Sequence, residues 1–173
     1  MTNWDAIVAD HGPAVWSNLW RLLADRADVE ECFQETFVAA LKFARREAVQ
    51  SWPALLCRLA TARAMDQLRK RYRQGGRWRN GDDGEDSARH GLSEAISTHA
   101  GPEEHAIAVE LSERLRAALA QLPDRQAEAF CLHAICGWTY RELGERMCMT
   151  DSAVGVTIHR ARQRLRTLLD DDR

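Results

Sequence analysis

The sequence predicts an all-α protein: two small helical domains joined by a flexible linker, the C-terminal domain being a helix-turn-helix. Apolar residues recur at three- and four-residue spacing, and the alternation typical of strands is absent. Six of the ten glycines fall in a polar, acidic stretch that ends in Gly101-Pro102. We therefore expect one domain at 1–73, a flexible acidic linker at 74–105 and a second domain at 106–173.

The first half of the N-terminal domain is expected to hold two helices. The first begins at Trp4 and is interrupted at Gly12-Pro13. The second resumes beyond the proline with one apolar stripe, made of Val15, Trp16, Leu19, Leu22 and Leu23.

Two more helices complete this domain. Asp28 is the expected N-cap of the first, with Glu31 three residues later completing a variant capping box. That helix is expected to bury Cys32, Phe33, Phe37 and Leu41. Pro53 suits the first turn of the next helix, whose inward residues are Leu55, Leu56, Leu59 and Leu68.

The C-terminal domain is expected to begin with a helix from about Glu103 to Gln121, whose apolar residues are Ile107, Leu111, Leu115 and Leu119. Asp124 is the expected cap of the next helix, which runs through Ile135, and Gly137 ends it in a left-handed conformation.

A helix-turn-helix pattern follows. Thr139 is the expected cap of a short helix, and Thr150 caps a long final helix that runs to about Leu169. Only a tight turn at Cys148-Met149 separates the two helices. The residues expected to turn inward and hold the pair together are Leu143, Val154 and Ile158.

Composition restricts the class of protein. The chain has 173 residues, of which 45% are apolar, enough to bury a core and to exclude global disorder. No run approaches the ~18 apolar residues of a membrane span. The first residues, MTNWDAIVADHG, lack a basic start and an apolar secretory segment, so we expect a cytoplasmic protein without membrane insertion.

The five cysteines are expected to be reduced, mostly buried thiols, because their number is odd and none forms a Cys-x-x-Cys pair. A zinc site from Cys131, His133 and Cys136 is the less favoured alternative, since zinc ligands usually stand closer together. Redox control through Cys131 and Cys136 is likewise less favoured than burial. We expect no cofactor and no metal.

The distribution of charge is more informative than the net charge of −2. Residues 1–73 carry 11 basic and 9 acidic side chains, 74–105 carry 3 and 7, and 106–173 carry 10 of each. Six basic residues gather between positions 58 and 73: Arg58, Arg63, Arg69, Lys70, Arg71 and Arg73. This segment is either a solvated helix face or a surface that contacts nucleic-acid phosphates, with Trp52, Tyr72 and Trp78 available to stack on unpaired bases.

The helix-turn-helix supplies a second candidate surface for DNA. The first turns of its second helix would enter the major groove and expose Ser152, Gly155, Val156, Thr157 and Arg160. The start of the preceding helix would hold a phosphate through Thr139, Tyr140 and Arg141. Arg162, Arg164 and Arg166 spread around the final helix, so only some of them would face DNA. The alternative is a helical hairpin that serves only as core.

An acidic helix face stands before the basic one, in the segment DVEECFQETF at 28–37. Considered alone, this segment indicates an ordinary amphipathic helix. Because acids repel DNA, any partner of this face would be a basic protein surface.

These three features, in this order, resemble the extracytoplasmic-function (group IV) sigma factors of bacterial RNA polymerase. DVEECFQETF at 28–37 and RAMDQLRKR at 63–71 are similar to the family's DAEDLVQETF and RAxDxLR motifs. LPDRQAEAFCLHAICGWTYRELGERM from Leu122 and AVGVTIHRARQRLR from Ala153 are similar to its C-terminal motifs.

The resemblance implies a non-enzymatic subunit that directs polymerase to promoters. Asp28, Glu31, Gln34 and Glu35 would bind the clamp helices of the largest catalytic subunit of the RNA polymerase core. Trp52 and the basic residues between 58 and 73 would recognise and melt the −10 element of promoter DNA, and the helix-turn-helix would read the −35 element. An anti-sigma factor is expected to hold such a protein silent.

Some residues depart from the family pattern. Gly155 and Thr157 replace frequent Lys and Arg, Ala62 replaces a common Asn, and the chain ends acidically at Asp170 to Asp172. A stand-alone helix-turn-helix regulator is the alternative function, but it would not account for the acidic segment at 28–37. An enzyme is disfavoured because phosphate loops, paired metal-ligand motifs and nucleophile elbows are missing from the sequence. A helical adaptor is the remaining alternative.

Overall fold

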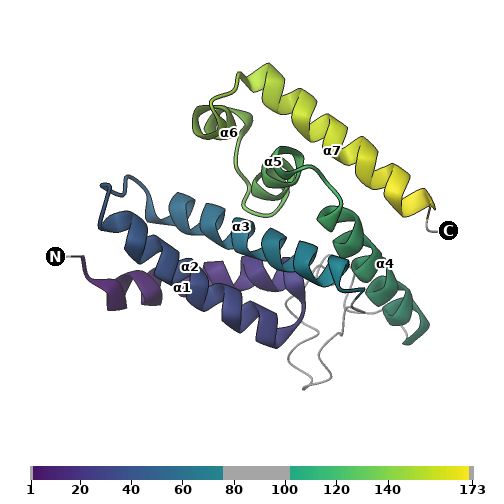
Figure 1. Ribbon diagram of the computed structural model, residues 1–173, viewed down its shortest axis with the longest axis horizontal. Coiled ribbons are helices and arrows are strands. Elements are labelled where there is room, and N and C mark those ends of the chain that lie inside the picture. Colours follow the sequence, from purple (N-terminus) through teal and green to yellow (C-terminus); the bar gives the residue numbers. More distant parts are fainter. Residues whose placement is uncertain (1, 76–101, 172–173) are drawn as a thin grey trace.

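The computed structural model describes residues 2–75 and 102–171, and within these ranges it is all-helical. The helices are α1 Trp4–Leu23, α2 Arg26–Ala44, α3 Trp52–Arg73, α4 Pro102–Ala120, α5 Asp124–Ala134, α6 Tyr140–Met147 and α7 Asp151–Asp171. We call α1–α3 the N-terminal unit and α4–α7 the C-terminal unit. Figure 1 shows α3 lying between the α1–α2 pair and α5, and α4 beside the C-terminal end of α3. The all-α class predicted from the sequence is confirmed.

The predicted break at Gly12-Pro13 is wrong, because α1 runs continuously through Pro13. Proline removes one backbone hydrogen bond and costs about 3 kcal/mol in a helix interior. Tertiary packing offsets this cost: Ile7, Val15 and Leu19 are all buried against the N-terminal unit's core on both sides of the proline. A Cβ at Gly12 would stand 3.5 Å from the Phe33 ring, so α2 packs closely at this point.

The N-cap of α2 is Asp25, three residues before the predicted Asp28. The Asp25 carboxylate accepts a hydrogen bond of 3.1 Å from the Asp28 backbone N–H. Asp28 lies within the first turn of the helix and is buried. Its carboxylate forms an ion pair with Arg71 of α3. The predicted capping box of Asp28 and Glu31 is therefore wrong.

Helix α3 begins as predicted, with Pro53 in its first turn and Ser51 as N-cap. It contacts α1, α2, α4 and α5, which makes it the central helix. Its buried residues reach into the C-terminal unit at two places: Met65 and Leu68 lie in one cluster with Leu119 and Cys131, and Cys57 lies in a second cluster with Leu132. The N-terminal and C-terminal units are thus packed against each other.

Helix α4 buries fewer apolar residues than its stripe predicts. Leu119 is buried, but Ile107 and Leu111 are 60% and 46% exposed. The buried face includes the charged Arg116, whose Nε donates to the Leu22 carbonyl oxygen of α1 at 3.0 Å. Burial lowers the pKa of this guanidinium to about 10, although the charge of Glu113 opposes the shift.

Helices α5 to α7 follow the prediction apart from one cap. Pro123 precedes α5 and no side chain caps that helix, so Asp124 has another role. Gly137 has a φ of +71°, as the predicted left-handed position requires. Thr139 and Thr150 cap α6 and α7, and Leu143, Val154 and Ile158 are fully buried between these helices. The predicted helix-turn-helix is present.

The prediction of reduced thiols is wrong for Cys57 and Cys136, which form a disulfide with a Cα–Cα distance of 6.6 Å. Cys32 and Cys131 are free and buried, and Cys148 is free and exposed. The zinc alternative gains no support, since no group of three or more metal-binding side chains occurs in the part of the chain that the structure describes. His133 instead bonds the Trp138 carbonyl oxygen through Nδ1 at 2.7 Å.

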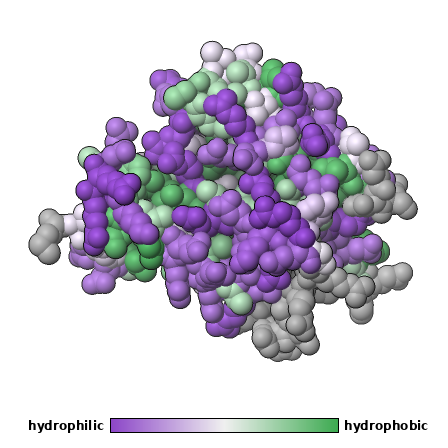
Figure 2. Space-filling model, viewed as in Figure 1, coloured by the Kyte–Doolittle hydropathy of each residue, from purple (hydrophilic) through white to green (hydrophobic). Residues whose placement is uncertain are grey.

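Most of the predicted linker, residues 76–101, and Trp78 with it lie outside the described residues. Its last residues are helical, because α4 begins at Pro102. Across the described ranges, no helix is long and apolar enough to cross a membrane. Hydrophilic residues cover most of the face that Figure 2 shows, with apolar patches between them.

Candidate nucleic-acid and polymerase interfaces

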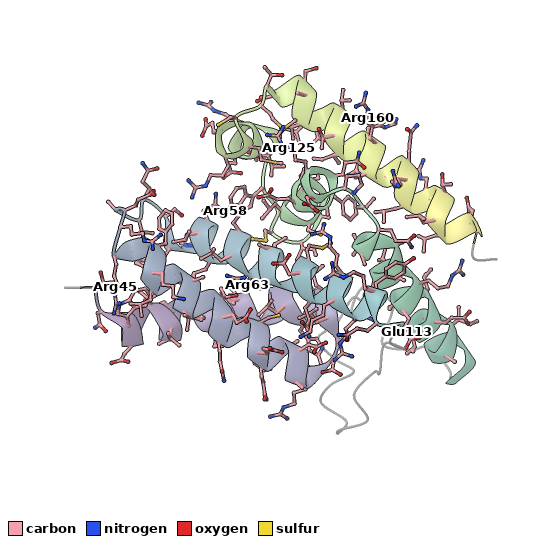
Figure 3. The ribbon with its side chains drawn as sticks, viewed as in Figure 1. Arg45, Arg58, Arg63, Glu113, Arg125 and Arg160 are labelled. Atoms are coloured by element: carbon pink, nitrogen blue, oxygen red, sulfur yellow. A yellow bond between two sulfur atoms is a disulfide. The ribbon has the colours of Figure 1, made fainter. Side chains whose placement is uncertain are left out.

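The predicted DNA-contacting residues of α3 do not share one environment. Lys70 and Arg73 are exposed, whereas Arg58 and Arg63 are half-buried. Arg63 lies 3.7 Å from the Glu35 carboxylate of α2 and 4.0 Å from that of Asp66. Figure 3 shows Arg58 and Arg63 along α3, and Arg160 on the outer side of α7.

Arg71 is bound inside the N-terminal unit. Its guanidinium forms ion pairs with Asp28 and, at 3.2 Å, with Asp25. Gln67 donates a hydrogen bond of 2.7 Å to the other oxygen of Asp28. Burial opposes the charge of Arg71, but the hydrogen bonds and charges of the two aspartates outweigh it and raise its pKa. Asp28 and Arg71 therefore clamp the start of α2 to the end of α3 instead of facing outward.

Arg69 reaches across to the C-terminal unit. Its Nη2 lies 2.9 Å from Asp124 Oδ1 at the start of α5, and its Nη1 lies 4.0 Å from Asp66. One of the predicted DNA contacts is thus paired with a carboxylate of the other unit. Asp124 does not cap α5, because it is the first residue inside the helix and Pro123 stands at the N-cap position.

Trp52 stands apart from the basic residues that gather at the end of α3. It is at the first turn of α3, about 28 Å from residue 71 at 1.5 Å per residue. Its ring meets Trp4 edge-on, with centroids 5.3 Å apart. Tyr72, by contrast, is 44% exposed at the far end of the helix. The predicted aromatic group is therefore split between the two ends of α3.

The outer face of α2 is accessible. Glu31, Gln34 and Glu35 are exposed there, and they line a shallow cavity of about 340 Å³ together with Val38 and other residues. Val38 is 49% exposed, which places an apolar side chain beside the acidic ones. Sequence reasoning missed Val38, although its spacing of three and four residues from Glu35 and Gln34 puts it on the same face.

On α7 the expected recognition residues lie at the exposed start of the helix. Ser152, Val156 and Arg160 are exposed, while Gly155 and Thr157 are half-buried. The Thr157 hydroxyl donates to the Ala153 carbonyl oxygen at 2.8 Å, and Gly155 lies under the Tyr140 ring.

His159 is an exposed residue that the sequence analysis missed. It stands three residues after Val156 and directly before Arg160, so the helical repeat places it on the exposed side of α7. That spacing was the available signal.

The start of α6 already holds an anionic group. The Thr139 backbone N–H donates to Glu142 at 2.8 Å, and the Glu142 N–H donates to the Thr139 hydroxyl at 3.2 Å. The hydrogen bond from the Thr139 backbone lowers the pKa of Glu142. The prediction that the Thr139 amide holds a phosphate is therefore not supported, because the carboxylate of Glu142 occupies it.

The neighbouring candidates on α6 differ in how freely they face solvent. Arg141 pairs with Glu145 at 3.1 Å, and both side chains are exposed. Tyr140 is tilted against the His133 ring, with centroids 5.1 Å apart. Arg141 is thus the more accessible of the two for contact with a phosphate.

Two family models match the chain, and each match lies within one of the two helical units. Sigma-70 region 2 matches residues 7–74, which hold the acidic face of α2 and the basic residues of α3. Sigma-70 region 4 matches residues 112–165, which hold the helix-turn-helix.

Curated relatives carry the same family name. The chain is 30% identical over 169 residues to the ECF RNA polymerase sigma factor SigE of Mycolicibacterium smegmatis, covering 98% of this chain and 62% of the relative. It is 26% identical over 175 residues to the ECF RNA polymerase sigma factor SigW of Bacillus subtilis, covering 95% and 88%. The match to ShbA of Streptomyces griseus, at 39% over 70 residues, covers 40% and 37%. The chain thus spans less than two thirds of the first of these relatives.

Proposed function

This chain belongs to the sigma-70 family, within its extracytoplasmic-function group, and on that premise we propose that it directs bacterial RNA polymerase core to specific promoters. One observation carries the proposal: both family regions are present in order, each on its own helical unit. Sigma factors are initiation factors and not enzymes. The protein acts in the cytoplasm, where polymerase and DNA are.

The N-terminal unit supplies the polymerase contact through the outer face of α2. Glu31, Gln34 and Glu35 offer negative charge around the exposed Val38. An apolar centre with a charged rim is the usual composition of a protein interface. Its partner is the pair of clamp helices of the largest polymerase subunit. Asp28 contributes indirectly, because its carboxylate anchors α2 to α3 through Arg71.

The basic residues of α3 engage the −10 element. Lys70 and Arg73 are exposed to solvent, and Arg58 and Arg63 are half-buried nearer the start of the helix. Trp52, at the other end of α3, is available for an unpaired base.

The C-terminal unit reads the −35 element with Ser152, Val156 and Arg160 on α7. Gly155 is half-buried against the Tyr140 ring and contributes no side chain to this contact, and the exposed Arg141 of α6 contacts a phosphate. An anti-sigma factor that covers the same surfaces is the expected inhibitor.

The test is transcription with purified components. The chain is expected to form a stable complex with core polymerase and to give promoter-dependent transcripts. Glu31→Lys places a positive charge against a basic partner, which costs several kcal/mol, so we expect affinity for core to fall at least about tenfold.

Glu47→Lys is the matched control, since it makes the same change of charge at an exposed residue beyond α2. Equal loss in both variants would refute the assignment of this face. High-affinity binding of free duplex DNA without polymerase would instead favour a stand-alone helix-turn-helix regulator.

A further inference from the structure

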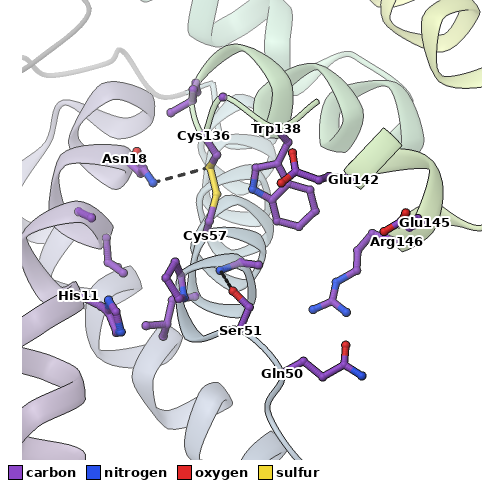
Figure 4. Close-up of a pocket in the computed structure, with 17 residues that line it drawn as sticks. His11, Asn18, Gln50, Ser51, Cys57, Cys136, Trp138, Glu142, Glu145 and Arg146 are labelled. Atoms are coloured by element: carbon purple, nitrogen blue, oxygen red, sulfur yellow. Dashed lines mark hydrogen bonds between the residues drawn. A yellow bond between two sulfur atoms is a disulfide. The ribbon is translucent and has the colours of Figure 1, made fainter. Parts of the chain in front are cut away.

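A covalent bond joins the two units that the proposed function assigns to different promoter elements. Cys57 lies on α3 of the N-terminal unit, and Cys136 lies in the turn after α5 of the C-terminal unit. The bond holds their Cα atoms 6.6 Å apart across 79 positions of sequence. Figure 4 shows the disulfide between His11 and Asn18 on one side and Trp138 and Glu142 on the other.

The disulfide lies in the wall of a cavity. This cavity has a volume of about 710 Å³ and is lined by residues of both units, including the two cysteines. Cys136 is the less buried of the pair, and Asn18 Nδ2 lies 3.7 Å from its sulfur. A thiol in solution can therefore approach Cys136 through the cavity.

Noncovalent contacts reinforce the same closed arrangement. Arg69 of α3 pairs with Asp124 of α5 at 2.9 Å, and Arg116 of α4 donates to the Leu22 carbonyl oxygen of α1 at 3.0 Å. In the shared core, the Cys131 thiol lies 3.9 Å from Met65 Sδ. The closed arrangement thus occupies Arg69, one of the basic residues assigned to DNA.

The closed arrangement is too small for the task of the two units. The −10 and −35 elements lie about 25 base pairs apart, or roughly 85 Å of duplex at ~3.4 Å per base pair. A compact chain of this length has a radius of gyration near 16 Å and is roughly 40 Å across. A closed molecule cannot place one unit on each element.

We propose that Cys57 and Cys136 are a redox-modification site whose disulfide locks the molecule in this closed, promoter-incompetent state and whose reduction by a dithiol releases it. The proposal rests on the proposed function. In cytoplasmic proteins, disulfides are usually transient or redox-sensing, which suits a bond placed between two domains. The segment between residues 75 and 102 is long enough, at up to about 3.5 Å per residue, to let the units separate.

The chemistry is thiol–disulfide exchange. A thiolate of the dithiol attacks Cys136 Sγ, the Cys57 sulfur leaves as a thiolate and takes up a proton, and a mixed disulfide forms. The second thiol of the reductant then attacks its own bonded sulfur, which frees Cys136 and leaves the reductant as a cyclic disulfide. In the reverse direction a small-molecule disulfide accepts the two electrons and two protons of the cysteine pair.

The test compares oxidised and dithiol-reduced full-length chain in promoter-dependent transcription with core polymerase. Peptide mass mapping first establishes the Cys57–Cys136 linkage in the oxidised sample. Because the lock depopulates the competent state, we expect at least about tenfold less transcript from the oxidised wild type. Cys57→Ser should transcribe like the reduced wild type under both conditions. Cys148→Ser, which removes a free exposed cysteine, should keep the wild-type response.

Each outcome decides the matter. Equal transcription by oxidised and reduced wild type would overturn the proposal, as would a response to the dithiol that persists in Cys57→Ser or an oxidised chain without the linkage. If neither the reduced wild type nor the folded Cys57→Ser variant supported transcription, the proposal that this chain is a sigma factor would be refuted. Circular dichroism of Cys57→Ser, compared with reduced wild type, separates that result from misfolding.

Discussion

At the scale of single residues, Lys70 and Arg71 are neighbours with different roles. Lys70 is exposed and bears its charge toward solvent. Arg71 is paired with Asp25 and Asp28, and Asp28 is buried. A buried carboxylate without its partner is costly, so the charge of Arg71 contributes to folding before it contributes to any DNA contact.

Substitution of these two residues should separate binding from stability. Arg71→Ala leaves Asp28 without its cation and is expected to lower the free energy of unfolding by about 2–4 kcal/mol. Lys70→Ala should change it by less than about 0.5 kcal/mol while weakening promoter binding and its salt dependence. Urea unfolding and salt titration of promoter binding measure the two effects. Equal stability of the two variants would contradict the structural role of Arg71.

The free thiols also differ residue by residue. Burial raises the pKa of Cys131 to about 12, and burial followed by the charge of Glu35 raises that of Cys32 to about 12. The thiolate is the reactive form, so both cysteines stay protonated and inert at neutral pH.

Alkylation of the native, oxidised chain at pH 8 should therefore label the exposed Cys148 alone among the free thiols. Raising the pH toward 10 should leave Cys32 and Cys131 unlabelled for as long as the protein stays folded, because their pKa values lie higher still. Mass spectrometry of tryptic peptides measures the labelling. Rapid modification of Cys131 would show that the shared core opens readily.

At the scale of elements, one glycine of the helix-turn-helix is required by close packing and another is not. A Cβ at Gly144 would stand 2.7 Å from the Met149 carbonyl oxygen, so the turn between α6 and α7 needs the missing side chain. A Cβ at Gly155 would meet the Tyr140 ring at 3.5 Å, which is ordinary van der Waals contact.

The corresponding alanine variants should move stability in opposite directions. Gly144→Ala forces the turn apart and is expected to cost about 1–3 kcal/mol. Gly155→Ala gains helix propensity and should add about 0.5–1 kcal/mol. Thermal unfolding followed by circular dichroism compares the two. A stabilised Gly144→Ala variant would refute the close approach of the turn.

Helix α1 shows how far local sequence rules extend. Ile7, Val15 and Leu19 follow one helical stripe on both sides of Pro13, so their spacing contained the evidence for a continuous helix. The local proline rule predicted a break because it counts only the lost hydrogen bond and the steric conflict. Packing of both halves against α2 and α3 outweighs that local cost.

At the scale of the whole molecule, the Cys57–Cys136 bond constrains the unfolded chain as well as the folded one. It closes a loop of 79 positions, which removes much of the conformational entropy of the unfolded state. Reduction should therefore lower the free energy of unfolding by about 2–4 kcal/mol.

Urea unfolding with and without a dithiol measures this loss. With and without the dithiol, Cys57→Ser should have the same free energy of unfolding as the reduced wild type. Cys148→Ser should lose stability on reduction, as the wild type does. An unchanged midpoint on reduction of the wild type would show that the loop constraint adds nothing to stability.

The charge of the molecule is distributed unevenly along the chain. The net charge of −2 averages +2 for residues 1–73, −4 for 74–105 and 0 for 106–173. In the structure, Arg69 and Arg71 are further neutralised by Asp124 and by Asp25 and Asp28. Weak binding of the isolated chain to random duplex DNA is the expected consequence, since the net charge is negative and these two arginines are paired with carboxylates.

Much of the candidate site was predictable. The acidic face of α2, the exposed Lys70 and Arg73, and the exposed Ser152, Val156 and Arg160 of α7 follow from helical spacing and charge, which are local properties. Gly155 and Thr157 were predicted to be exposed and are half-buried. The sequence analysis did not predict that Glu142 accepts the hydrogen bond of the Thr139 amide, although a Glu three residues after the N-cap is the usual capping-box partner. Whether a charge is free or paired depends on which helix packs beside it.

The sequence by itself determined the all-helical class, the caps Thr139 and Thr150 and the helix-turn-helix, because each of these depends on residues within a few positions of one another. Tertiary structure alone decided three long-range pairings: Cys57 with Cys136, Arg69 with Asp124, and Arg71 with Asp28. The physical reason is that these partners lie on different helices, and no local spacing encodes which helix faces meet when the chain buries its core. Two of those pairings, Cys57 with Cys136 and Arg69 with Asp124, join the N-terminal unit to the C-terminal unit.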